Sequence, residues 1–430
     1  MTTVSASVIR RFPAFASPDF RRLFFNAFFT SAARWALMLA RGWLVFELTE
    51  SSFAVGVVTF ASMVQFIVVG PIAGAVADRL DRRQIALAGG VLLFLSSAAL
   101  AALTLGGVAE VWHVVVLAAV DGIAVASSQP AIQSLVPNVV PREHLLNAVS
   151  LSGITRHGSR LIGPLFGGVL LATLGAGSVF LLSAIGLVFA TAMLWRVELR
   201  LAPNADRGPV ARNVLADVAA GFGHVRHDGR IAVVLLCVAF HCGFTMAFDS
   251  LLPQLATNVG GGSRTFSAIV MGVGAGAIVG TISLSMVRQQ VVQGYALALT
   301  GIGSGIAMVV LGFAATPVAA VVGAVLAGGT QATYMAVSLT LIQQIVPDAL
   351  RGRVMSIYMM LAAGHMAMMN FGFGWAADRI GVRPLMVVPG LLWIAVFVIA
   401  ALSFTELRHV LRRGVFVPRL TRAATPEAAS

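Results

Sequence analysis

Ionisable and amide side chains stand inside long apolar stretches of this sequence. Arg34 and Arg41 are seven residues apart, two helical turns, and therefore share one helix face. A charge in hydrocarbon costs at least ~2.5 kcal/mol at the centre of a bilayer, so such groups face a cavity or a partner. The candidates for a substrate or proton site are Asp121, Arg34, Arg41, His241, Asp249, Gln331 and Tyr334.

Each kind of candidate has a second interpretation. Asp121 could hold a proton or a cationic substrate, or it could form a structural ion pair between helices. Arg34 and Arg41 could attract an anionic substrate, although we favour neutralisation of Asp121 and Glu47. His241 fits a satisfied core histidine better than a ligand.

The composition indicates that the solvent of these stretches is lipid. Of 430 residues, 58% are hydrophobic and 11% are charged, whereas a soluble domain carries about 25% charged residues. The net charge of +12 comes from arginines in short loops, which favours membrane topology over nucleic-acid binding. We therefore expect a lipid-embedded protein with no nucleic-acid partner.

The sequence carries no pattern typical of an enzyme. It has no Ser/His/Asp set, no His/Cys metal spacing and no nucleotide-binding loop. Cys237 and Cys242 lie five apart in one apolar run and are interpreted as packing residues. We expect no catalytic activity, no cofactor and no metal.

Twelve apolar runs are each long enough to cross a bilayer, which takes about 20 residues per helix. The fold class predicted is therefore an all-α membrane protein of about twelve transmembrane helices. The runs cover residues 23–46, 53–77, 85–108, 111–136, 147–174, 177–195, 230–256, 266–287, 294–314, 318–346, 353–376 and 384–404.

The arginines predict the orientation. With a cytoplasmic N-terminus, the inner loops and tails hold 22 of the 29 arginines and the outer loops hold three. The positive-inside rule then places both termini in the cytoplasm of a plasma-membrane protein. The longest interruption follows the sixth run and divides the chain into a tail, a half, a linker, a half and a tail: 1–22, 23–195, 196–229, 230–404 and 405–430.

The segment between the second and third runs has the most specific pattern. It reads Gly70-Pro71-Ile72-Ala73-Gly74-Ala75-Val76-Ala77-Asp78-Arg79-Leu80-Asp81-Arg82-Arg83. Gly74 permits close helix contact, and the arginines hold the loop at the membrane surface. Such a charged loop can form ion pairs that break when neighbouring helices move.

This pattern resembles the loop signature of the major facilitator superfamily. An aspartate in place of the second glycine is similar to the siderophore and macrolide exporter branch. The segments 136–148 and 346–356 occupy corresponding places in the two halves and support the same branch. The resemblance implies two six-helix pseudo-repeats around a central cavity lined by the first, fourth, seventh and tenth spans. In that arrangement Asp121 could pair with Arg34 or Arg41.

The fifth run carries Gly163-Pro164-Leu165-Phe166-Gly167-Gly168 directly after Arg160. Proline removes a backbone hydrogen bond and glycines leave a thin helix, so this span is predicted to bend between states. It is similar to the span-five motif of superfamily exporters, which are mostly proton antiporters. The fourth run lacks the arginine of many proton-coupled members, so protons remain only a candidate coupling ion.

The resemblance implies a secondary transporter that exports a small, partly apolar molecule by alternating access, and we expect a monomer. An importer, a uniporter or a non-transporting receptor on the same fold remain alternatives. The residues expected to act in gating are Gly74, Asp78, Arg79, Arg82, Arg83, Arg160, Gly163, Pro164, Gly167, Gly168, Arg351, Gly352 and Arg353.

Overall fold

The apolar runs fold into long α-helices in a computed structural model that describes residues 12–69, 81–197, 223, 225–286, 290–346 and 348–414. The first half contains η1 (Pro13–Ala16), α2 (Pro18–Thr49), α3 (Ser52–Met63), α5 (Arg82–Leu105), α6 (Val111–Val139), η2 (Arg142–His144), α7 (Leu145–Leu174) and α8 (Ala176–Trp195). The second half contains α10 (Gly229–His241), η3 (Cys242–Met246), η4 (Asp249–Leu251), α11 (Leu252–Asn258), α12 (Gly262–Ser285), α13 (Gln290–Gly312), α14 (Pro317–Ile345), α15 (Asp348–Ile380), α16 (Val382–Ser403) and α17 (Thr405–Arg413).

Ten helical segments of the described residues are long and apolar enough to cross a membrane. The other two predicted spans, 147–174 and 353–376, coincide with α7 and α15, helices of 30 and 33 residues. These two are less uniformly apolar, since α7 carries Arg160 and α15 carries His365 and Asn370. The described residues contain no strand. The predicted all-α membrane fold is confirmed.

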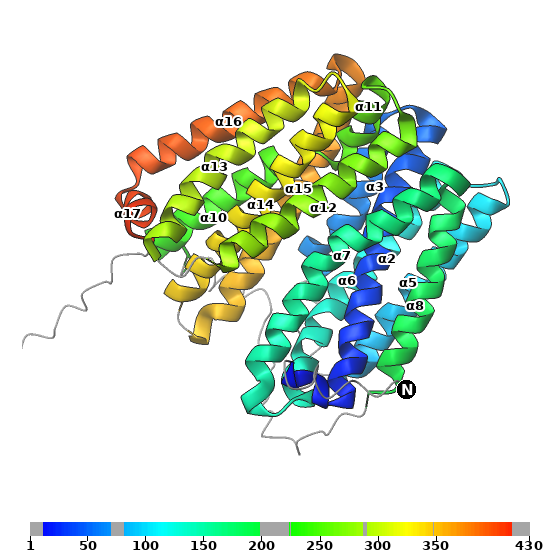
Figure 1. Cartoon of the computed structure of the whole chain (residues 1–430), viewed down its shortest axis with the longest axis horizontal. Coiled ribbons are helices and arrows are strands. Elements are labelled where there is room, and N and C mark those ends of the chain that lie inside the picture. Colours follow the sequence, from blue (N-terminus) through cyan, green and yellow to red (C-terminus); the bar gives the residue numbers. More distant parts are fainter. Residues whose placement is uncertain are drawn as a thin grey trace, which may run out of the picture.

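The helices gather into two groups that follow the sequence (Figure 1). Helices α2 to α8, blue to green, lie on one side, and α10 to α17, green to red, lie on the other. The main packing between the groups joins α3 to α15 and α7 to α12. The two halves therefore meet along two helix pairs.

Glycines allow these helix pairs to approach closely. A Cβ at Gly56 of α3 would stand 2.7 Å from the carbonyl oxygen of Asn370, and one at Gly374 of α15 would stand 2.4 Å from that of Ser52. In the other pair, a Cβ at Gly274 of α12 would stand 2.6 Å from the carbonyl oxygen of Arg160. Small residues at such positions let membrane helices gain van der Waals contact, which is the main attraction available in lipid.

The seventh span is broken, whereas the sequence analysis expected one continuous run over 230–256. After α10 the backbone makes the π-helical turn η3, leaves helical geometry at Ala247, and resumes as η4 and α11. A break inside a bilayer must have its free backbone groups paired by protein. Two side chains that come from α14 and α15 provide that pairing.

Gln331 and Asn370 supply the hydrogen bonds at the break. Gln331 Nε2 donates to the carbonyl oxygen of Thr245 at 2.5 Å. The backbone N–H of Ser250 donates to Asn370 Oδ1 at 3.0 Å, and Ser250 Oγ donates to the Asn370 carbonyl oxygen at 3.0 Å. The interruption is therefore stabilised by partners that lie 86 and 120 residues away in the sequence.

The segments outside the two groups are described only in part. The predicted tail from residue 405 begins with the helix α17, which buries Leu407 and Val410 and packs on α13 and α16. Most of the predicted linker 196–229, the tail beyond 414 and residues 1–11 lie outside the described residues. The proposed division at 23–195 and 230–404 therefore stays a prediction.

Candidate functional site

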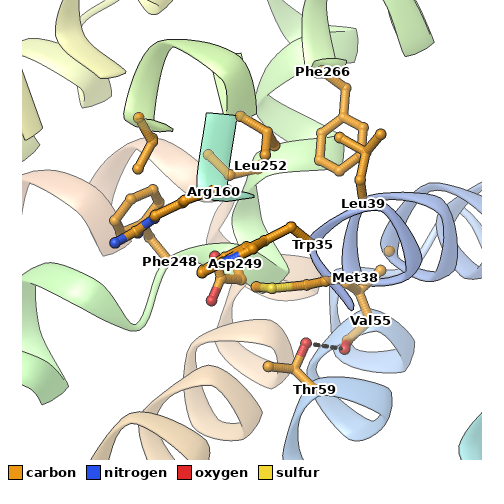
Figure 2. Close-up of a pocket in the computed structure, with 13 residues that line it drawn as sticks. Trp35, Met38, Leu39, Val55, Thr59, Arg160, Phe248, Asp249, Leu252 and Phe266 are labelled. Carbon is orange, nitrogen blue, oxygen red and sulfur yellow. Dashed lines mark hydrogen bonds between the residues drawn. The ribbon is translucent and has the colours of Figure 1, made fainter. Parts of the chain in front are cut away.

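A pocket of about 550 Å³, counting its open mouth, lies between the two groups of helices. One wall comes from α2, α3 and α7, and the other comes from the segment at the break in the seventh span and from α12. The lining residues are Trp35, Met38, Leu39, Gly42, Val55, Thr59, Arg160, Phe248, Asp249, Leu252, Phe266, Val270 and Val273 (Figure 2).

Two opposite charges face this otherwise largely apolar pocket. Arg160 comes from α7, and its guanidinium carbon lies 4.8 Å from the ring centroid of Trp35 on α2, a cation–π contact. Asp249 comes from η4, at the break in the seventh span. Figure 2 shows both side chains in the same pocket. We refer to Arg160 and Asp249 together as the open cluster.

The two charges of the open cluster do not form an ion pair with each other. Ion pairs in the described part of the chain join Arg22 to Asp19, Arg41 to Asp121, and Arg230 to Asp228. Arg160 and Asp249 interact electrostatically but do not approach to ion-pair distance. Asp249 Oδ2 is buried and has no hydrogen-bond partner within that part. The sequence analysis assigned Asp249 to the site and Arg160 to gating, and the structure brings them to one pocket.

A second group of charges lies within the first half. Arg41 Nη2 donates a hydrogen bond to Asp121 Oδ2, and the two residues are only 6% and 5% exposed. Arg34 interacts electrostatically with both. We refer to Arg34, Arg41 and Asp121 as the paired cluster. Two interpretations were left open for Asp121, and the contact with Arg41 has the geometry of an ion pair between helices. The functional role of each of the three residues stays a prediction.

The other predicted site residues lie in the second half. His241 is fully buried, its ring stacks on Tyr334 with a centroid distance of 4.2 Å, and Trp393 packs against it edge-on at 5.0 Å. Both imidazole nitrogens are buried without a hydrogen-bond partner among the described residues. None of these three residues lines the pocket, and Gln331 serves the backbone break instead.

The glycines of the span-five motif lie at packing contacts of α7. Helix α7 continues through Pro164. A Cβ at Gly163 would stand 2.4 Å from the carbonyl oxygen of Ala32 on α2. One at Gly167 would stand 3.1 Å from the Cβ of Ala36, and one at Gly168 would stand 2.8 Å from that of Ser267 on α12. The motif therefore fits α7 between a helix of its own half and one of the other half, and bending between states stays a prediction.

The predicted gating loop is described only at its end. Gly74, Asp78 and Arg79 lie outside the described residues. The backbone of Arg351, Gly352 and Arg353 belongs to α15, but the surroundings of these three residues are not described. Arg82 is exposed. Arg83 donates a hydrogen bond to the carbonyl oxygen of Trp195, at the end of α8. That contact lies within the first half.

A polar contact that the sequence analysis did not identify joins the halves where α3 begins. Asp378 of α15 accepts a hydrogen bond from Ser51 Oγ at 2.5 Å and from the backbone N–H groups of Ser52 and Phe53 at 2.7 and 3.3 Å. Ser52 Oγ also donates to Gln254 Oε1 at 2.8 Å. A carboxylate is favoured at a helix N-terminus, where backbone N–H groups point outward. We refer to Asp378 and its three donors as the latch.

The described residues hold no group of three or more metal-ligating side chains. Cys237 and Cys242 are buried free thiols in the second half, at packing positions.

Residues that sequence reasoning missed are Trp35, Phe248 and Asp378. Nothing in an apolar run distinguishes a ring that lines a pocket from one that packs in the core. Asp378 did carry a signal, because it is a carboxylate two residues beyond the predicted end of the span 353–376.

Known proteins resemble this chain along most of its length. A family model described as a transmembrane secretion effector of the major facilitator type matches residues 10–412. The chain is 22% identical to macrolide efflux protein A of Streptococcus pyogenes over 85% of this chain and 92% of that protein. It is 24% identical to the enterobactin exporter of Citrobacter koseri over 79% of this chain and 81% of that protein. Among solved structures, a peptide transporter of the POT type matches with a TM-score of 0.73 at 14% identity, covering 93% of this chain and 95% of that one. That similarity concerns the fold alone.

Proposed function

This chain belongs to the transmembrane secretion effector family of major facilitator transporters, and we propose that it exports a small, partly apolar molecule across the plasma membrane. The family and the exporter names of the relatives support a transporter of small molecules rather than an enzyme. The observation that carries the proposal is the pocket between the halves, because residues of both halves line it. A ligand there would change its surroundings whenever one half moves against the other.

Alternating access would use the two helix pairs that join the halves. The latch and the glycines of α3 and α15 lie at the end where α2 finishes and α3 begins. By the positive-inside rule this end faces outward and both termini face the cytoplasm. We propose that the described state is closed toward the outside, and that export requires the latch to open.

The direction of transport is tested with everted membrane vesicles, whose outer surface is the former cytoplasmic face. The vesicles are energised to be acid inside, monitored with a pH-sensitive dye, and offered a panel of antibiotics, dyes and siderophores. We expect at least one compound to accumulate inside vesicles that contain the protein and not in vesicles without it. Accumulation confined to right-side-out vesicles would contradict export and favour import.

The same assay examines coupling to protons. If export is exchange for protons, adding the compound releases protons from the vesicles, and Asp249→Asn abolishes that release while Glu47→Gln preserves it. Glu47 is an exposed carboxylate at the end of α2 and serves as the matched control. Transport without proton release would indicate another coupling ion or uniport.

A further inference from the structure

The open cluster has an unusual charge balance for a pocket in a bilayer. Its two charged residues have opposite signs, and they come from different halves of the molecule. A buried charge that lacks a partner is costly in such surroundings. Arg160 and Asp249 attract each other electrostatically without forming an ion pair, Arg160 lies over the ring of Trp35, and Asp249 Oδ2 has no hydrogen-bond partner among the described residues. The hydrogen-bonding capacity of both charged groups is therefore available to a ligand in the pocket.

The charge of a ligand decides which of the two groups gains an oppositely charged hydrogen-bond partner. A neutral ligand would offer an oppositely charged group to neither Arg160 nor Asp249. An anion would serve Arg160 only, and a cation would serve Asp249 only. A molecule with one group of each sign would serve both, and charge-assisted hydrogen bonds are the strongest that such groups form.

The uncharged side chains that line the pocket indicate what kind of uncharged group the ligand carries. Trp35 packs against Arg160 from the first half, while Phe248 and Phe266 belong to the second half. Met38 adds a flexible, polarisable side chain, a type that adapts to varied apolar shapes. These side chains favour an apolar, ring-bearing body beside the charged head.

We propose that the pocket selects zwitterions with an apolar body, whose acidic group binds Arg160 and whose basic group binds Asp249. This inference rests on the proposed function in taking the pocket as the substrate site. It goes beyond that function by assigning a substrate class and by giving each charge its own ligand group. Because the two charges belong to different halves, such a ligand bridges them.

The test uses four fluorescent probes that share one dansyl tail. Nε-dansyl-lysine is the zwitterion, its α-N-acetyl derivative is an anion, its methyl ester is a cation, and the doubly blocked compound is neutral. Binding to the purified full-length protein is followed by the rise in dansyl fluorescence in an apolar site. We expect the zwitterion to bind at least about tenfold more tightly than either singly charged probe, and the neutral probe to bind most weakly.

Two variants assign the charges separately. With Asp249→Asn the zwitterion should lose its advantage over the anion, because the basic group no longer has a partner. With Arg160→Gln it should lose its advantage over the cation. Glu47→Gln and Arg379→Gln remove exposed charges of the same signs and should leave all four affinities unchanged.

Equal binding of the four probes, or an advantage of the zwitterion that survives both variants, would overturn the inference. The binding result is independent of the vesicle experiment on export, because binding to the purified protein in detergent does not depend on the direction of transport. Zwitterion preference without outward transport would refute export alone. Export of neutral compounds without zwitterion preference would refute this inference alone. A variant that elutes as aggregate is replaced by Asp249→Ser or Arg160→Met, which change the same charge.

Discussion

The paired cluster and the open cluster are built from the same residue types and differ in their surroundings. In the paired cluster, Arg41 and Asp121 belong to helices of one half, touch each other and are almost fully buried. In the open cluster, Arg160 and Asp249 belong to different halves, form no ion pair and face a pocket. A charged side chain that is buried against an oppositely charged partner holds helices in place. A charged side chain that faces a pocket is available to bind a ligand.

The difference follows from the local backbone. Asp121 lies in the unbroken helix α6, so its neighbours are fixed by helix packing. Asp249 lies where the seventh span is interrupted, and there the backbone is held by Gln331 and Asn370 rather than by its own helix. Discontinuous membrane helices commonly place their ends at binding sites.

Breaking the ion pair should have the largest effect on stability. Arg41→Met alone leaves Asp121 as an uncompensated buried charge, a loss of about 3–5 kcal/mol. Changing both residues, Arg41→Met with Asp121→Leu, should recover most of that loss because no unpaired charge remains. Thermal unfolding of the purified proteins in detergent measures both. If the double variant is as unstable as the single one, the pair is not acting as a structural contact.

The second-largest loss of stability should come from the contact between α7 and α12 at Gly274, beside the open cluster. Gly274→Val places side-chain atoms against the carbonyl oxygen of Arg160, where even a Cβ would stand at 2.6 Å. Overpacking of this kind costs about 1–3 kcal/mol. We also expect transport to be lost because α7 and α12 can no longer approach. Gly158→Ala on α7 meets no atom within 4 Å and is the control. Normal transport by Gly274→Val would show that this close approach is not needed.

The latch should contribute less to the free energy of unfolding than either of these contacts. Asp378→Asn removes the charge at the N-terminus of α3, an interaction of about 0.3–1 kcal/mol. The equilibrium should then shift toward a state open at this end. A cysteine at Val55, which is 2% exposed and lines the pocket, reports that shift in a background with Cys237 and Cys242 changed to alanine.

Labelling of that cysteine in whole cells by a membrane-impermeant maleimide should be faster with Asp378→Asn than with the native residue. Arg379→Gln, one residue along, is the control, because Arg379 stacks on the ring of Trp375 in its own helix and donates a hydrogen bond to the Trp375 carbonyl oxygen. Unchanged labelling in the Asp378 variant would remove the latch from the mechanism.

The smallest effect on stability should come from the open cluster itself. Asp249→Asn removes a carboxylate whose Oδ2 makes no hydrogen bond with the described residues, so the unfolding free energy should fall much less than with Arg41→Met. The same detergent unfolding assay measures it. A loss as large as that of Arg41→Met would make the two clusters equivalent and remove the distinction drawn between them.

The sequence predicted the fold well and the site only in part. Apolar runs and arginine-rich loops report directly on the bilayer, so the membrane spans could be placed from the sequence. The break at Ala247 could not, because it depends on Gln331 and Asn370, which reach it only after folding. Charges in apolar runs pointed to Asp121 and Asp249 alike, and only packing distinguishes them. Aromatic residues such as Trp35 do not reveal the position of the pocket, because aromatic rings also pack in the core throughout this sequence.

The most direct test of this distinction is transport in everted vesicles by Asp249→Asn and by the double variant Arg41→Met with Asp121→Leu. Both are compared with the native protein at equal amounts of folded protein, with Nε-dansyl-lysine as the probe. We predict that Asp249→Asn loses accumulation of the probe while the double variant retains most of it. Retained transport in Asp249→Asn together with loss in the double variant would contradict the assignment and place the site at the paired cluster.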